Sequence, residues 1–329
     1  MEKMRHCHET AQIGAAGVPA DILCAGHAAY DLYFFLAAYP EENGKYETAD
    51  GMECGGGPAA NAAVLAARWG LVAAFAGTVG GDAYGRLVAE EFRAAGVDIS
   101  LLRLLPGAAT PVSAILVNLS NGSRTVVNRR SSPALPADPE IDAAALKALA
   151  PRVMLFDGHA PELAAAAMAA CPEAITILDA GSVRPGTELL APRVDYLIAS
   201  EKFARGATGI ADLHSPEGAA AALKGLRELN PRATVAITVG ERGAYYLDGR
   251  QVRHVPALKV KAVDTTAAGD IFHGAFAYGL ARGYPAAAAM ELAAAAAGLS
   301  VTRRGGRPSI PALEEVLPLL SPASRKHTG

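Results

Sequence analysis

One stretch of the sequence, Val263 to Gly279, joins a run of small residues to an acidic residue at the start of an apolar helical pattern. The small residues are Ala267 to Gly269, and the pattern begins at Asp270. Backbone N–H groups at such a helix N-terminus can approach an anion closely, and the helix dipole adds about half a positive charge there. Asp270 could accept a proton from a hydroxyl group beside them. The stretch predicts an anion hole next to a general base, and a tight turn capped by Asp270 is the alternative.

A second stretch, Glu53 to Gly80, combines consecutive glycines with a polar residue in the next helix. Gly55 to Gly57 permit backbone conformations that other residues avoid and leave room for a ligand against the main chain. Asn61 follows one turn into the predicted helix, where its amide could bind a polyol. A glycine-rich turn followed by a satisfied buried asparagine is the alternative.

The elements that must position these residues alternate along the chain. Apolar runs such as Ile22 to His27 and Val153 to Gly158 are separated by alanine-rich helical stretches, which indicates an α/β fold with a mostly parallel sheet covered on both faces. Two segments, about 31–54 and 111–130, interrupt that order. The second contains Ser120-Asn121-Gly122 between β-branched residues, a hairpin signal. We therefore expect a small β-sheet lid on one α/β domain over 21–325, after a flexible extension over 1–20.

Composition excludes several classes of protein. The 329 residues are 51% hydrophobic and carry a formal net charge of −3, which argues against disorder and against nucleic-acid binding. The four cysteines form no CxxC pair, so we expect neither a zinc site nor a disulfide framework, and a reducing cytoplasm fits. No apolar stretch is long enough for a membrane span.

Together the two motifs resemble the signatures of the PfkB, or ribokinase-like, carbohydrate kinases. The first signature is met by Gly56, Gly57, Ala59, Asn61, Gly70 and Gly80. The second, a DTxxAGD-type run, is met by Asp264, Thr265, Ala267, Ala268, Gly269 and Asp270. The resemblance covers about 21–311. Where the family has an NxxE motif, this chain has Ser200 and Glu201, which look like the ketohexokinase and sulfofructose kinase branch.

The resemblance implies a ribokinase-like fold. It also implies an enzyme that uses ATP, Mg²⁺ and K⁺. It implies that Asp270 is the base and that the anion hole is formed by Ala267, Ala268 and Gly269. Sugar hydroxyls would be bound by Asp31, Gly56, Gly57 and Asn61. The nucleotide would lie along Ser200, Glu201, Thr238, Gly240 and Gly243, with Glu201 in the magnesium-water role. The monovalent cation would take oxygens from Asp264, Thr266, Ser300, Arg303, Gly305 and Ser309.

The resemblance also bears on the sugar. In the sulfofructose kinase branch a lysine, an asparagine and an arginine surround an anionic head group, and Lys45 and Asn128 match the first two. His159 stands at the arginine position, so an acidic or strongly polar ketose is one expectation. A neutral ketohexose or pentose, with Lys45 solvated on the lid, is the alternative.

The predicted activity is ATP-dependent phosphorylation of a primary hydroxyl of a monosaccharide, with the lid excluding water. A nucleoside kinase of the same fold and a non-catalytic sugar-binding relative are the alternatives. Lid sheets leave exposed edges, so a homodimer through the lids is expected. The basic cluster of Arg303, Arg304 and Arg307 is expected to be a solvated surface.

Overall fold

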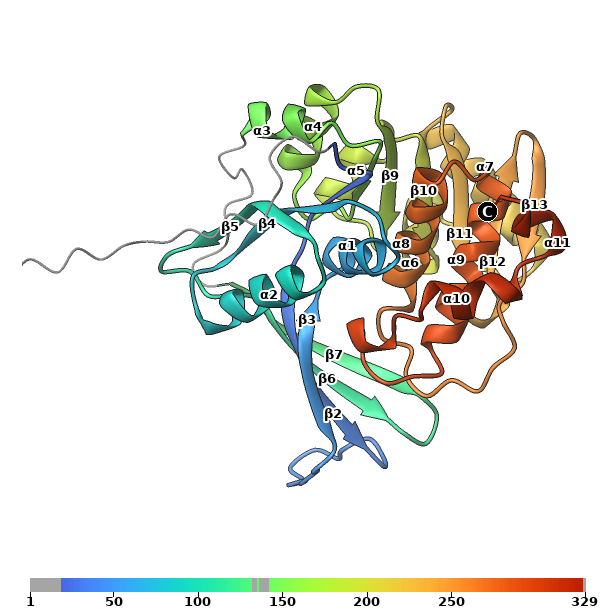
Figure 1. Cartoon of the computed structure of the whole chain (residues 1–329). Helices are drawn as coiled ribbons and strands as arrows, with labels where there is room; N and C mark the ends of the chain where they lie inside the picture. The colour runs from blue at the N-terminus through green and yellow to red at the C-terminus, as the bar shows by residue number, and fades with distance from the viewer. Residues whose placement is uncertain (1–18, 132–134, 136–141, 328–329) are drawn as a thin grey trace, which may run out of the picture.

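The computed structural model describes residues 19–131, 135 and 142–327, which form a large sheet and a small one (Figure 1). The large sheet has nine strands in the order β13-β12-β11-β10-β9-β8-β1-β4-β5. Its seven parallel strands are β1 (Ile22–Ala25), β4 (Ala73–Gly80), β5 (Asp98–Leu105), β8 (Val153–Phe156), β9 (Ile175–Ala180), β10 (Tyr196–Ser200) and β11 (Thr234–Thr238). The antiparallel pair β12 (Ala244–Asp248) and β13 (Gln251–Val255) completes one edge.

Helices cover both faces of this sheet, which confirms the predicted α/β class. One face packs on α1 (Pro58–Arg68), α2 (Ala83–Ala94), α8 (Ala268–Ala281) and α9 (Ala286–Ser300). The other packs on α3 (Ala143–Leu149), α4 (Pro161–Ala170), α5 (Pro185–Leu190), α6 (Glu201–Thr208) and α7 (Pro216–Leu229). In β1, Ile22 and Cys24 join the first core and Leu23 and Ala25 the second. Burial on both sides explains why the strands read as unbroken apolar runs.

Short helices complete the C-terminal part, and small residues let the main ones pack closely. The short elements are η1 (Gly240–Arg242), η2 (Arg307–Ser309), α10 (Leu313–Val316), η3 (Leu317–Leu319) and α11 (Pro322–Arg325). A Cβ at Gly274 would lie only 3.0 Å from Ala62 Cα, so α8 and α1 touch nearly backbone to backbone. This contact places the N-terminal ends of α1 and α8, with their predicted site residues, side by side.

The small sheet is built from the two segments that interrupt the βα order. Its order is β3 (Gly51–Gly56), β2 (Ala29–Leu36), β6 (Val112–Asn118) and β7 (Ser123–Arg129), and only the β2–β6 pair is parallel. It projects from the body beside α1 and α2 (Figure 1) and has a core of its own around Tyr33, Phe35 and Ile115. The predicted second sheet is thus confirmed.

The β6–β7 hairpin turns through Leu119 to Gly122, and within it Gly122 has a positive φ of 72°. A Cβ at Gly122 would lie 3.0 Å from the carbonyl oxygen of Ala262, so the hairpin tip rests on the segment that leads into α8. Among the described residues, no helix combines the length and hydropathy that a membrane crossing requires.

Candidate functional site

The predicted base and the predicted sugar-binding asparagine meet at the junction of α1 and α8. Asn61 Nδ2 donates to Asp270 Oδ2 over 2.7 Å. Ala267 caps α8 with a left-handed backbone, φ 60°, a conformation that costs a residue with a Cβ about 1 to 2 kcal/mol. The turn through Gly269 thereby ends with backbone N–H groups that no side chain caps. These groups can bind an anion directly beside Asp270.

The glycines before α1 make room for charged side chains. A Cβ at Gly56 would lie 2.0 Å from Asp31 Oδ2, and Gly57 has a φ of 104°. Asp31 is buried and paired in register with Ser113, which hydrogen-bonds its carboxylate. Asp31, Gly56 and Asn61 therefore gather as the sequence predicts, on the side of the site that faces the lid.

Burial sets the protonation of the carboxylates at this site. It raises the pKa of Asp270 to about 6, helped by the nearby carboxylate of Asp179. Burial likewise raises the pKa of Asp31 to about 6, with Asp270 adding to the rise. A base with a pKa just below neutrality is ionised at pH 7 and still accepts a proton from a hydroxyl as its bond forms.

Sequence reasoning missed Asp179 and the histidine that accompanies it. Asp179 is the next-to-last residue of β9, its pKa is raised to about 7 by burial, and its Oδ2 lies 3.2 Å from Nδ1 of His273. The same ring nitrogen of His273 lies 2.6 Å from the carbonyl oxygen of Gly269, in the anion-hole turn. The acidic end of a buried strand was the available signal for Asp179.

Arg307 corrects the expectation of a solvated basic cluster. Arg304 is exposed, but the Arg307 residue is only 2% exposed. Its Nε donates to Asn61 Oδ1 over 3.1 Å, and its Nη1 donates to Glu91 Oε2 over 2.9 Å. A Cβ at Gly55 would lie 2.1 Å from Nη1, which explains the third glycine of the run. Arg307 thus holds Asn61, which in turn donates to Asp270.

A cavity of about 700 Å³ adjoins the anion-hole turn. Of the predicted nucleotide and phosphate residues, it is lined by Thr238, Gly240, Gly243, Ala268 and Gly269. Ser200 and Glu201 do not line it. Ser200 Oγ accepts from the amide of Phe203 as the cap of α6, and Glu201 pairs with Arg205 and His214. A Cβ at Gly240 would lie 3.9 Å from Glu201 Oε1, so this carboxylate borders the cavity.

The predicted cation residues lie in two segments that meet behind the anion hole. Asp264 is fully buried, and its Oδ1 accepts from the amide and the hydroxyl of Thr266. Its Oδ2 accepts from the amide of Gly305 over 2.9 Å. The carboxylate of Asp264 therefore accepts hydrogen bonds from both segments and joins them. The remaining predicted ligands belong to the same region: Ser300, whose hydroxyl donates to Ala297 O; Ser309, whose hydroxyl donates to Gly306 O; and Arg303, whose amide donates to Ser300 O.

A second cavity, of about 670 Å³, opens between the lid and the large sheet. Among its described lining residues none is acidic and five are basic: His27, Arg129, Arg130, His159 and Arg184. Asn128 and Ser113 line it from the lid. Lys45 does not line it, and it lies in a segment, residues 41–50, in which every residue is exposed. The structure therefore groups Asn128 with His159 but not with Lys45.

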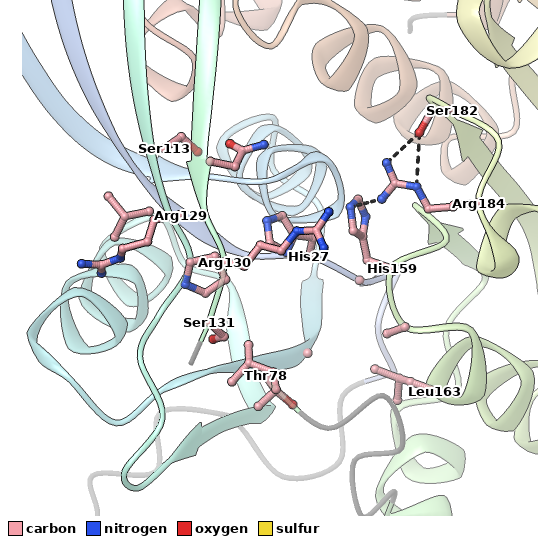
Figure 2. Close-up of a pocket in the computed structure, with 17 residues that line it drawn as sticks. His27, Thr78, Ser113, Arg129, Arg130, Ser131, His159, Leu163, Ser182 and Arg184 are labelled. Carbon is pink, nitrogen blue, oxygen red and sulfur yellow. Dashed lines mark hydrogen bonds between the residues drawn. The ribbon is translucent and has the colours of Figure 1, made fainter. Parts of the chain in front are cut away.

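In the wall of this cavity, the side chain of Arg184 contacts Ser182 and His159 (Figure 2). Its Nη2 and Nε donate to Ser182 Oγ over 2.8 and 3.3 Å, and its Nη1 contacts His159 Nε2. His159 in turn stacks on His27, with ring centroids 4.7 Å apart. Burial, followed by the proximity of His159, lowers the pKa of His27 to about 4, so His27 is neutral at pH 7. The lasting positive charge of the cavity comes from its arginines.

Comparison with known proteins shows which family has this sequence and fold. The family described as pfkB family carbohydrate kinase matches residues 19–313. The chain belongs to this family. As a pfkB family carbohydrate kinase, it catalyses ATP-dependent phosphoryl transfer. It is 31% identical to a ribokinase of Schizosaccharomyces pombe over 287 residues, which are 81% of this chain and 87% of the relative.

Two further relatives extend the likeness over nearly the whole chain. A deoxyribokinase of Salmonella typhi is 29% identical over 92% of this pfkB kinase and 99% of the relative. The structure of Arabidopsis thaliana ribokinase complexed with ribose and ATP matches with a TM-score of 0.78 and 26% identity, over 92% of this chain and 99% of that one. The ketohexokinase and sulfofructose kinase branch stays a prediction.

Proposed function

We propose that this pfkB kinase phosphorylates a primary hydroxyl of a ketose or ketose-like monosaccharide with Asp270 as the base. The observation that supports this is the placement of Asp270 between two cavities. It directly follows Gly269, which lines the nucleotide cavity. On the other side its charge acts on Asp31, whose carboxylate is hydrogen-bonded to Ser113 in the wall of the lid cavity. Asp31 and Asn61 would orient the sugar hydroxyls toward Asp270.

In this mechanism Asp270 takes the proton of the hydroxyl as its oxygen attacks the terminal phosphorus of ATP. The N–H groups of Ala267 to Gly269 would stabilise the developing charge. Mg²⁺ bound with ATP would supply positive charge that offsets part of the phosphate charge. Glu201 fits a role toward its water shell, because its carboxylate borders the cavity at Gly240 and oxygen ligands suit this ion.

The basic cavity favours a sugar that carries an acidic group at the end remote from the transferred phosphate. Among the described residues no carboxylate forms an ion pair with Arg184; Asp157 pairs with the His159 that Arg184 contacts, and Asp179 interacts with its charge through space. His159 and Asn128 add hydrogen-bonding groups around it. The sequence-based expectation gave this role to Lys45, and the geometry supports Arg184 in its place. Neutral pentoses, such as those the relatives' names indicate, remain the alternative acceptors.

Replacing Arg184 by Gln is expected to lower kcat/KM for an acidic sugar at least about tenfold, because one charge-assisted hydrogen bond contributes about 1.5 to 3 kcal/mol. A coupled ATP assay measures this on matched pairs: ketoses, pentoses and their carboxylated or sulfonated counterparts, with nucleosides beside them. The neutral member of each pair should change less than about twofold. Arg193→Gln, at an exposed arginine outside both cavities, is the control.

The same panel separates the other functions. Turnover confined to nucleosides would identify a nucleoside kinase. Sugar binding without ATP turnover would identify a non-catalytic relative, against which the intact Asp270–Asn61 pair argues. A wild-type preference for neutral sugars, left unchanged by Arg184→Gln, would return the substrate to a neutral ketose or pentose.

K⁺ is expected to raise activity at constant ionic strength where tetramethylammonium does not. We propose that it binds backbone oxygens around Asp264, Thr266 and Gly305, because the carboxylate of Asp264 already holds these two segments together. A cation there would rigidify the anion-hole turn without touching the substrate. Initial rates in the two chloride salts measure the effect, and equal rates would remove the cation from the mechanism.

We also propose that two copies of the protein form a homodimer through their lids. The face of its sheet that alternates with the Asp31 face carries Leu32, Phe34, Leu116 and Val127, among which Phe34 is 41% and Val127 59% exposed. A second copy of the lid would bury this apolar surface and protect the strand edges from other partners.

A further inference from the structure

The tip of the lid hairpin reaches the nucleotide side of the site. Gly122 packs on Ala262, and the residues Asn121 to Arg124 line the nucleotide cavity together with Ala268 and Gly269. Figure 1 shows this tip beside the orange segment that leads into α8. A lid that covered only the sugar would not need to line the cavity on the other side of Asp270.

Arg124 is a lid residue that contacts the segment leading into the anion hole. Its Nη1 donates to Thr265 Oγ1 over 2.8 Å, a contact between residues 141 positions apart. The amide of Ala268 in turn donates to the carbonyl of Thr265 over 3.4 Å. The side chain of Arg124 is exposed and makes no ion pair within the described parts of the chain. Its remaining guanidinium N–H groups can therefore serve a ligand.

The charge of the nucleotide cavity points to the ligand. Among its described lining residues Arg124 is the single basic one, and Glu241 is acidic. ATP carries several negative charges, and charge shifts during transfer among the oxygens of its terminal phosphoryl group and the oxygens that enter and leave. The N–H groups at the start of α8 are neutral donors. Arg124 is therefore the one described residue of this cavity wall that can bring a positively charged side chain to the phosphates.

We propose that Arg124 is a catalytic arginine that the lid delivers to the terminal phosphoryl group of ATP. Its guanidinium donates to a non-bridging oxygen of that group while the bond from phosphorus to the departing ADP oxygen breaks and the bond to the sugar oxygen forms. Arg124 transfers no proton, since Asp270 takes the proton of the hydroxyl. The inference rests on the proposed phosphoryl transfer, and it makes lid closure part of the chemistry as well as of sugar binding.

Replacing Arg124 by Gln is expected to lower kcat at least about tenfold, with the KM for the sugar changed less than about twofold. Arg124→Lys should recover part of the rate, because it keeps the charge but loses the planar, forked donor set. Arg250→Gln, at an exposed arginine on the β12–β13 turn, should behave as wild type.

Binding measurements give a readout that a merely structural role would not move. The probes are ADP alone and ADP with aluminium fluoride, Mg²⁺ and the sugar, where the fluoride mimics the group in transfer. Arg124→Gln should weaken the second complex about as much as it lowers kcat, and should leave the first unchanged. A variant that keeps more than half of wild-type kcat, or that weakens both complexes equally, overturns the inference. Absence of turnover in the wild type on every sugar would instead defeat the proposed function.

Discussion

Asp270→Asn is expected to reduce kcat at least about 100-fold while ATP still binds. The substitution keeps the size of the side chain and leaves an oxygen to accept from Asn61 Nδ2, but it removes the group that takes the proton. The loss should therefore fall on kcat rather than on the Kd for ATP. Steady-state kinetics and calorimetric titration with a non-hydrolysable ATP analogue measure the two quantities.

Stability separates loss of chemistry from loss of fold in this variant. Burial raises the pKa of Asp270, so its ionised form costs folding free energy at pH 7. The neutral asparagine removes that cost, and Asp270→Asn should unfold at the wild-type temperature or above. Turnover above half of the wild-type value would contradict the assignment of Asp270 as base.

The pH dependence of wild-type activity tests whether Asp270 must be ionised. The base must be ionised, and the pKa of Asp270 is raised to about 6. Activity should therefore be full at pH 7 to 8 and should fall as the pH drops through about 6. An acid limb near pH 4, the range of an ordinary carboxyl group, would contradict a buried base.

Local patterns were enough to predict most of the fold and the centre of the site. Strand and helix alternation depends on residues a few positions apart, and so does the anion-hole turn that ends in Asp270. The lid sheet followed from the break in that alternation and from the turn residues at Gly122. In each case the residues that predict the element lie within that element or next to it in the sequence.

The residues that sequence reasoning missed act across elements distant in the chain. Asp179 pairs with His273 of α8, and Arg184 contacts His159 in the wall of the lid cavity, on strands or loops that only the sheet order brings together. Lys45 illustrates the converse. It stands in a motif that resembles a substrate loop, but its exposure depends on how far that loop projects, which no local pattern specifies.

Arg307 is the strongest example, because its charge by itself predicts a surface residue. Its guanidinium lies 4.8 Å from the ring centroid of Phe92 and bridges Asn61 and Glu91, residues more than 200 positions away. Glu91 accepts from the amide of Gly55 with both oxygens, so the same cluster fixes the glycine turn before α1. The buried arginine therefore connects the glycine turn, α1, α2 and the C-terminal segment.

Arg307→Met is accordingly expected to lower the free energy of unfolding by about 3 kcal/mol, the scale found when one partner of a buried pair is removed. The side chain of Glu91 is 34% exposed and can regain water, but Asn61 Oδ1 is left without its donor in a buried position. Because Asn61 then loses the contact that orients it toward Asp270, kcat should fall as well. Urea unfolding and steady-state kinetics measure the two losses.

Arg253→Met is the control, since Arg253 also pairs with a carboxylate, Asp248, but does so where the two side chains are 52% and 59% exposed. An exposed pair of this kind contributes at most about 1 kcal/mol. Equal losses of stability in the two variants would show that burial of Arg307 adds nothing to its pairing. A large loss of stability for the Arg307 variant alone would show that the buried guanidinium stabilises the fold through its contacts. A fall in kcat beside it would show that Arg307 also positions Asn61, and through Asn61 the proposed base Asp270.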